Sequence, residues 1–313
     1  MEYDTEEELS RILQDDFFQK HRSVSIGEGS NLLFISDFNG IVLHSCIQGI
    51  VVTDEDVDSV LLRVGAGVHW DDVVAYAVAN GWGGIENLSY IPGEAGAAAV
   101  QNIGAYGVEI KDVIKTVETM HPLTGKKQLF THEACRYGYR HSFFKEVADQ
   151  DPYIITYIYI RLQKQPQFNL DYGNIGTLLS GHAITLHSVR ETVIEIRRSK
   201  LPEPAVLGNA GSFFVNPIIS QSHFDRLKYR FPAIPSYPAP EGKVKIPAAW
   251  LIEQCGFKGK REGRVGVYAK QALIIVNHGG ATSDEITAFA HKITRTVNDT
   301  YGITLIPEVK YIQ

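Results

Sequence analysis

The sequence predicts an α+β fold, in which helices and strands follow one another without a regular βαβ alternation. β-prone runs such as residues 154–162 are separated irregularly by amphipathic helical segments such as residues 70–80. The chain shows neither an internal repeat nor a low-complexity tract. Its 313 residues are too many for one small domain and suit two or three packed units.

The first fifty residues read as a helix followed by short strands. Thr5 is an expected helix cap, with Glu8 three positions later and Leu9 and Leu13 on the apolar face. β-branched residues between glycine-containing turns predict strands at residues 22–26, 32–35, 41–43 and 49–52.

The remaining chain divides at a proline-rich segment, residues 200–204, which we expect to be a linker because two prolines oppose both helix and central strand. Before it we expect strands at 59–64 and 154–162, helices at 70–80 and 189–198, and a long loop at 92–107. After it we expect strands at 212–215, 272–277 and 304–309, and helices at 222–229, 248–255 and 283–298, the last capped by Ser283.

Composition is that of an ordinary globular enzyme, with 44% hydrophobic and 21% charged residues. A net charge of −6 argues against a nucleic-acid partner, which requires a basic surface. No run reaches the ~18 apolar residues of a membrane span, and the acidic N-terminus does not resemble a signal peptide. Cys46, Cys135 and Cys255 are isolated, so we expect no disulfide framework, no metal site and a cytoplasmic location.

Several common signatures are absent. Gly65-Ala66-Gly67 follows a strand, but Trp70 occupies the position of the third glycine in a dinucleotide fingerprint. Ser212 has Phe214 where a hydrolase nucleophile elbow requires glycine. Neither a P-loop nor an HExxH zinc motif occurs.

Two glycine-rich segments are candidates for ligand binding. In residues 27–31, two glycines allow positive φ and exposed N–H groups that form an anion-binding nest; a tight hairpin is the alternative. Residues 92–107 are poor in bulky and charged side chains, which permits close backbone approach to a flat ligand carrying a pyrophosphate. The alternative there is a buried packing loop of small residues.

Three further segments carry polar groups suited to chemistry. Residues 136–145 interleave cations with aromatic rings and could bind phosphate or stack on rings, the alternative being a solvated strand face. Ser212 places a hydroxyl where a flexible turn enters a strand, and Glu308 is a lone carboxylate in an apolar segment. A raised pKa or a cationic partner is expected of such a carboxylate, in either a functional or a structural role.

These five segments, in this order, resemble the UDP-N-acetylenolpyruvoylglucosamine reductase family. The similarity extends from GEGSNLLF to IPEV and is carried by IPGEAGAAAVQNIGAYGVE, YRHSFFK and GNAGSFFVNP. It implies an FAD-binding fold of the vanillyl-alcohol-oxidase type, made of two subdomains, with an α+β substrate-binding domain. The implied boundaries are residues 1–50 and 51–200 for FAD and 201–308 for substrate, with residues 309–313 returning to the first subdomain.

The resemblance also implies roles for individual residues. The family uses NADPH and noncovalent FAD to reduce the enolpyruvyl group of a UDP-sugar in peptidoglycan precursor synthesis, and no obligate protein partner is indicated. The implied catalytic residues are Arg140, Ser212 and Glu308. The implied FAD contacts are Gly27, Glu28, Gly29, Ser30, Asn31, Pro92, Gly93, Gly96, Asn102, Gly104, Tyr106 and Gly107. The implied substrate contacts are Tyr172, Lys200, Asn216, Tyr237 and Gln271.

One departure from the family concerns the N-terminus. Family members carry an upstream segment with an Asn-Thr-Phe motif, whereas Met1 here nearly abuts the first helix. We therefore expect the first subdomain to be short of a strand and of part of its flavin site. Two alternatives stay open from sequence: another FAD-linked oxidase of this fold, and a noncatalytic protein that binds flavin or a UDP-sugar.

Overall fold

The computed structural model describes residues 1–148, 150 and 152–313, which form two compact units. Unit 1 comprises Met1–Gly29 and Asn39–Arg197, and unit 2 comprises Ser30–Phe38 and Arg198–Gln313. The chain therefore passes from one unit to the other three times, after Gly29, Phe38 and Arg197.

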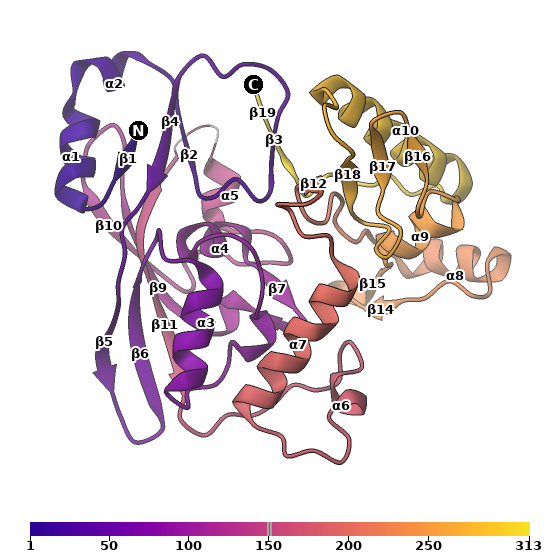
Figure 1. Cartoon of the computed structure of the whole chain (residues 1–313), viewed down its shortest axis with the longest axis horizontal. Coiled ribbons are helices and arrows are strands. Elements are labelled where there is room, and N and C mark those ends of the chain that lie inside the picture. Colours follow the sequence, from indigo (N-terminus) through magenta and orange to yellow (C-terminus); the bar gives the residue numbers. More distant parts are fainter. Residues whose placement is uncertain (149, 151) are drawn as a thin grey trace. The chain divides into compact units, whose positions relative to one another are not determined.

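Unit 1 is built on two sheets (Figure 1). A parallel sheet of order β1-β4-β2 contains β1 (Glu2–Tyr3), β4 (Ile41–Ser45) and β2 (Ser23–Ile26). An antiparallel sheet of order β10-β9-β11-β6-β5 contains β10 (Lys127–Thr131), β9 (Ile114–Met120), β11 (Ile154–Gln163), β6 (Ser59–Gly65) and β5 (Ile50–Glu55). The smaller elements are the hairpin β7 (Gly104–Ala105) and β8 (Val108–Glu109), and 3-10 turns at Glu86–Leu88 and Ile110–Asp112.

Two of the helices in this part of the chain pack on the antiparallel sheet through short apolar side chains. The helices are α1 (Glu6–Gln14), α2 (Asp16–Lys20), α3 (Trp70–Ala79), α4 (Ala95–Gln101), α5 (Phe143–Val147), α6 (Ile175–Leu178) and α7 (Leu186–Lys200). Thr5 caps α1 as expected, accepting a hydrogen bond from the Glu8 N–H at 3.1 Å. Helices α3 and α4 contribute valines and alanines to the main core, which they share with β6 and β11.

Unit 2 contains shorter strands around one core. The strands are β12 (Gly208–Asn209), β18 (Ile275–Asn277), β17 (Val265–Val267) and β16 (Arg261–Glu262) in one sheet, and β13 (Ile218–Ser220), β15 (Lys243–Lys245) and β14 (Tyr237–Pro238) in another. Strand β3 (Leu32–Phe34) pairs in parallel with β19 (Lys310–Ile312). The helices are α8 (Gln221–Arg230), α9 (Ala248–Gln254) and α10 (Ser283–Tyr301), with a 3-10 turn at Pro240–Gly242.

Four expected elements differ from the structure. Residues 95–101 are a helix rather than a loop. Residues 212–215 form no strand with the described residues and pair only through the bridge Phe214–Pro307. The C-terminal strand begins at Lys310, after the expected range. Thr282, not Ser283, caps α10, because its hydroxyl and the Glu285 side chain form a reciprocal capping box.

Gly65 and Gly67, which do not belong to a dinucleotide fingerprint, are required by close backbone packing. A Cβ on Gly65 would collide with the carbonyl oxygen of Ile47, and one on Gly67 with that of Ser45. Backbone atoms cannot rotate away as a side chain would. The end of β6 thus lies directly against the chain that leaves β4.

Among the described residues, every helix is too short or too polar to cross a lipid bilayer.

We predict that Gly65→Ala lowers the free energy of unfolding by about 1–3 kcal/mol, because the added methyl overpacks a contact with backbone. Gly138→Ala is the matched control, since its Cβ would meet His141 at an ordinary 3.6 Å. Urea unfolding of both variants measures the difference. Equal stability of the two proteins would contradict the packing argument.

Candidate active site

The glycine-rich turn after β2 lies against the second glycine-rich segment. Glu28 joins them, because its Oε2 accepts a hydrogen bond from the Gly93 N–H at 2.9 Å. A Cβ on Gly27 would approach Glu94 Oε2 to 2.9 Å, and Gly29 has a φ of +75°. Unit 1 therefore brings residues 27–29, from the first segment expected to bind FAD, against the second segment.

The small residues of the second segment are explained by helix packing. Ala95, Ala98 and Ala99 of α4 are buried in the core. A Cβ on Gly96 would lie 2.9 Å from the Ala66 Cβ, so this helix approaches the chain after β6 as closely as glycine allows. The small residues of α4 thus serve packing in the core. Contact with a ligand is expected from the residues before and after this helix.

Asn102 terminates α4 and fixes the path of the chain beyond the helix. It is fully buried and has a φ of 45°, a left-handed conformation that asparagine tolerates. Its Nδ2 donates to Glu109 Oε2 at 2.9 Å and to the Gly138 carbonyl at 2.7 Å, and its Oδ1 accepts from the Lys111 N–H at 3.2 Å. One side chain therefore connects three separate segments of unit 1.

Arg140 lies beside this connection. Its Nη2 donates to the Gly104 carbonyl at 2.9 Å and its Nη1 to the Asn102 carbonyl at 3.5 Å. The backbone of Arg140 is left-handed, with a φ of 53°. Ser142 is buried and caps α5. Residues 136–145 are thus a partly buried turn and helix start, and the alternative of a solvated strand face is wrong.

Tyr106 is accompanied by a second arginine that the sequence did not single out. Burial lowers the pKa of Arg197, the positive charge of Arg140 adds to that effect, and Tyr106 and Asp71 oppose it. The Arg197 Nε also donates to the Tyr90 carbonyl at 2.9 Å. Two guanidinium groups that act on each other electrostatically favour an anion between or beside them.

Two asparagines, the buried Asn87 and the half-buried Asn169, contact the end of the second segment. Asn87 Nδ2 donates to the carbonyls of Tyr106 at 2.9 Å and Asn169 at 2.8 Å, and Asn169 Nδ2 donates to the Gly107 carbonyl at 3.2 Å. Within the described residues, Asn87 Oδ1 and Asn169 Oδ1 have no hydrogen-bond donor. Tyr172 is near, since its Cδ2 would lie 2.9 Å from a Cβ on Gly107, and the Tyr172 side chain is 43% exposed.

Unit 2 brings the backbones of Ser212 and Glu308 close together. Phe213 lies between them in the hydrogen-bond pattern: its carbonyl accepts from the Glu308 N–H at 2.8 Å, and its N–H donates to the Leu273 carbonyl at 2.8 Å. Asn31 is attached to the same point, because its Nδ2 donates to the Glu308 carbonyl at 3.2 Å. Ser30 and Asn31 thus continue the glycine-rich turn into unit 2.

The other expected substrate residues occupy several places. Asn216 Oδ1 accepts from the Ala248 N–H at 2.9 Å at the start of α9, and Gln271 Oε1 accepts from the Leu273 N–H at 3.3 Å. Tyr237 belongs to β14 and is 43% exposed, and Lys200 is the last residue of α7. Gln271 is therefore close to Ser212, because Leu273 bonds both to the Gln271 side chain and to the Phe213 N–H. Tyr237 and Lys200 belong to other elements of the fold.

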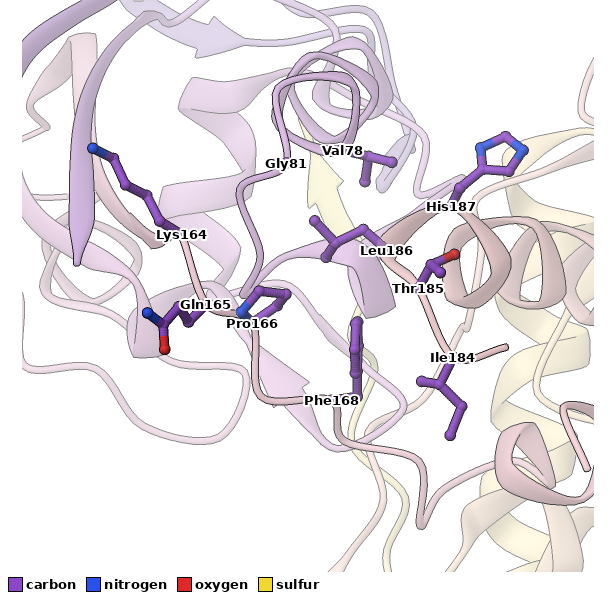
Figure 2. Close-up of a pocket in the computed structure, with 10 residues that line it drawn as sticks. All are labelled: Val78, Gly81, Lys164, Gln165, Pro166, Phe168, Ile184, Thr185, Leu186 and His187. Carbon is purple, nitrogen blue, oxygen red and sulfur yellow. The ribbon is translucent and has the colours of Figure 1, made fainter. Parts of the chain in front are cut away.

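A separate pocket of about 690 Å³ opens on unit 1 (Figure 2). Its walls carry mainly apolar side chains, and the Lys164 Nζ is bonded to Glu55 at 2.6 Å. None of the residues expected to bind FAD or substrate lines it. The lining residues are Val78, Gly81, Lys164, Gln165, Pro166, Phe168, Ile184, Thr185, Leu186 and His187.

Comparison with known proteins decides the family. Residues 203–312 match the C-terminal domain of UDP-N-acetylenolpyruvoylglucosamine reductase, and residues 1–126 match an FAD binding domain. The UDP-N-acetylenolpyruvoylglucosamine reductase of Porphyromonas gingivalis is 54% identical over 314 residues, covering 100% of this chain and 93% of that protein. The chain belongs to the UDP-N-acetylenolpyruvoylglucosamine reductase family.

Other members of the reductase family agree with this assignment. The protein of the same name from Bacteroides fragilis is 48% identical over 92% of this chain and 86% of its own length. The crystal structure of the reductase from Thermus caldophilus superposes with a TM-score of 0.67 and 22% identity, covering 100% of this chain and 91% of that one. The expected fold class, a vanillyl-alcohol-oxidase-type FAD-binding fold with an additional α+β domain, is confirmed.

The residues of unit 1 fit the FAD of this reductase family. The unsatisfied oxygens of Asn87 and Asn169 would accept hydrogen bonds from a ligand's N–H groups. Such acceptors suit a ring system with N–H groups on its edge, such as the flavin.

Sequence patterns missed several residues of this region. Arg197 falls in a charged helical run that looks solvent-exposed, and Asn87 lies in an ordinary turn. His69 also escaped notice, although its Nδ1 is 2.8 Å from Glu28 Oε1. Only their proximity to the glycine-rich segments in the fold distinguishes these residues, and no local pattern in the sequence indicates that proximity.

We predict that Asn102→Ala destabilises the protein by about 2–4 kcal/mol, because it leaves three hydrogen-bonding groups unmatched and forces alanine into a left-handed conformation. Asn102→Gly restores the backbone freedom but not the amide, so its loss should be smaller. Urea unfolding and retention of flavin on gel filtration measure both effects. Wild-type stability in Asn102→Ala would show that the amide does not hold these segments.

Proposed function

We infer that this chain uses NADPH and FAD to reduce the enolpyruvyl group of UDP-N-acetylglucosamine-enolpyruvate, giving UDP-N-acetylmuramate for peptidoglycan synthesis. Identity of 54% over the whole chain supports this activity most strongly. FAD, when bound, supplies the hydride chemistry that side chains lack. We propose that it is held without a covalent bond by the residues of the two glycine-rich segments.

We propose that Arg140 holds the substrate carboxylate. Hydride addition to the methylene carbon of the enolpyruvyl group moves negative charge toward that carboxylate. Two carbonyls, of Asn102 and Gly104, already orient the Arg140 guanidinium, so little reorganisation is required when the charge develops. Arg197 adds positive potential nearby, in keeping with the electrostatic effect of Arg140 on the pKa of Arg197.

We propose that Ser212 donates the proton that completes the reduction at the α-carbon, and that Glu308 hydrogen-bonds the carboxylate. The backbone hydrogen bonds through Phe213 support this assignment, because they fix the Cα positions of both residues relative to one another. Serine is a weak acid, but the carbon it protonates is strongly basic after hydride addition. We further propose that Tyr172, Lys200, Asn216, Tyr237 and Gln271 bind the UDP-sugar.

The chemistry favours this reaction over the two alternatives. The substrate of an alcohol or lactone oxidase has no carboxylate for Arg140 to bind. A noncatalytic binding protein would not require a proton donor such as the Ser212 hydroxyl.

We predict that Ser212→Ala leaves flavin bleaching by NADPH unchanged and slows recolouring by the enolpyruvyl sugar by about 10²–10⁴-fold. Alanine adds no bulk, so folding and flavin binding should survive. Stopped-flow absorbance separates the two half-reactions, and Ser222→Ala on the exposed face of α8 is the control. Equal losses in both phases would indicate a structural role for Ser212, and wild-type recolouring would identify another acid. Absence of NADPH-dependent bleaching in the wild type would refute the activity itself.

We also predict that Tyr172→Phe weakens binding of the UDP-sugar by about 10- to 150-fold, the equivalent of a hydrogen bond of ~1.5–3 kcal/mol to a charged acceptor. Flavin reduction by NADPH should be unaffected. Substrate titration of flavin fluorescence measures the affinity, with Tyr229→Phe as the control because Tyr229 is 93% exposed. Unchanged affinity would remove Tyr172 from the substrate site.

A further inference from the structure

Three side chains of metal-binding type converge on one face of the parallel sheet in unit 1. Strands β1 and β4 pair so that Glu2 lies directly opposite His44. Cys46 follows two residues after His44, and side chains two apart along an extended chain point to the same side. A carboxylate, an imidazole and a thiol thus meet without any motif in the sequence.

The distances suit a tetrahedral ion. His44 Nδ1 is 3.2 Å from Glu2 Oε1 and 3.8 Å from Cys46 Sγ, and all three ligand atoms lie within 4.8 Å of one another. Zinc bonds of about 2.0–2.2 Å to nitrogen and oxygen and about 2.3 Å to sulfur give tetrahedral edges of about 3.3 Å and about 3.6 Å. The Glu2 side chain is 71% exposed and is free to adjust its last torsions to complete the geometry.

Glu94 gives the imidazole a defined orientation. Its Oε1 lies 2.8 Å from His44 Nε2, and the Glu94 side chain is only 6% exposed. If Nε2 carries the hydrogen for this bond, the Nδ1 lone pair faces the carboxylate of Glu2 and the sulfur of Cys46. Three electron-pair donors then face one another, an arrangement that a cation stabilises. A carboxylate behind a metal-bound histidine is also the usual outer partner of zinc ligands.

We propose that Glu2, His44 and Cys46 bind one divalent transition-metal ion of the zinc type, with water as the fourth ligand and Glu94 as the group that orients His44. The thiol and imidazole select zinc-like ions over Mg²⁺ and Ca²⁺, which require oxygen ligands. This site does not depend on the reductase activity. It joins β1 to β4 and, through Glu94, to the turn at Gly27.

Cobalt is the probe that tests the site, because tetrahedral Co²⁺ absorbs strongly and a thiolate ligand adds a charge-transfer band. Titration of the full-length flavin-loaded protein should give one such Co²⁺ per chain, seen in difference spectra beyond the flavin absorption and displaced by Zn²⁺. Glu94→Gln should weaken Zn²⁺ binding by about 10- to 100-fold.

Two variants decide whether these residues are the ligands. Cys46→Ser should abolish the charge-transfer band, and Glu2→Gln, at an exposed side chain that cannot affect folding strongly, should reduce affinity. Cys255→Ser, in unit 2, is the control that should leave the spectrum unchanged. Only weak octahedral Co²⁺ absorption, or a tetrahedral spectrum that survives Cys46→Ser, would overturn the proposal.

Discussion

The buried amide of Asn102 is the constraint on which the candidate active site in unit 1 depends. A helix that ends inside a core must satisfy its last carbonyls and turn the chain at once. Asn102 does both, because its backbone N–H donates to the Ala98 and Ala99 carbonyls and its backbone is left-handed. Its side chain in addition bonds to Glu109, Gly138 and Lys111. The carbonyl groups that orient Arg140 belong to the same short stretch. Removing this amide would therefore disturb the arginine as well as the helix.

Local sequence patterns predict most of the helices and strands, and they fail where tertiary packing determines the conformation of a segment. The helix at Trp70–Ala79 and the strand at Ile154–Gln163 have strong periodicity and agree with the prediction within a residue or two. Helix α4 does not agree with the prediction, because glycine in an alanine-rich run is typical of a loop. In the structure Gly96 instead allows close packing against Ala66. The segment around Phe213 looks like a strand in the sequence, yet its hydrogen bonds go to two different neighbours.

For the candidate active site, the sequence could indicate which residue types take part but not which residues contact one another in the fold. The glycine-rich segments were recognisable, and the structure places Glu28 of the first against Gly93 of the second. Arg197, Asn87 and Glu94 stayed invisible because their roles arise from contacts with residues far away along the chain. The roles assigned to Arg140, Ser212 and Glu308 rest on family resemblance and chemistry; the structure adds that Ser212 and Glu308 are neighbours in unit 2.

The pairing of β3 with β19 has a consequence for synthesis on the ribosome. Asn31, just before β3, bonds to Glu308, which is 277 positions later in the chain. At about 5–20 residues per second, β3 emerges roughly 15–55 s before its partner strand is made. During that interval β3 exposes an unpaired edge containing Leu33, which packs on the core of unit 2 only in the finished fold. Unit 2 therefore completes its fold after translation of residues 310–312, and the nascent chain has to keep this edge from pairing elsewhere.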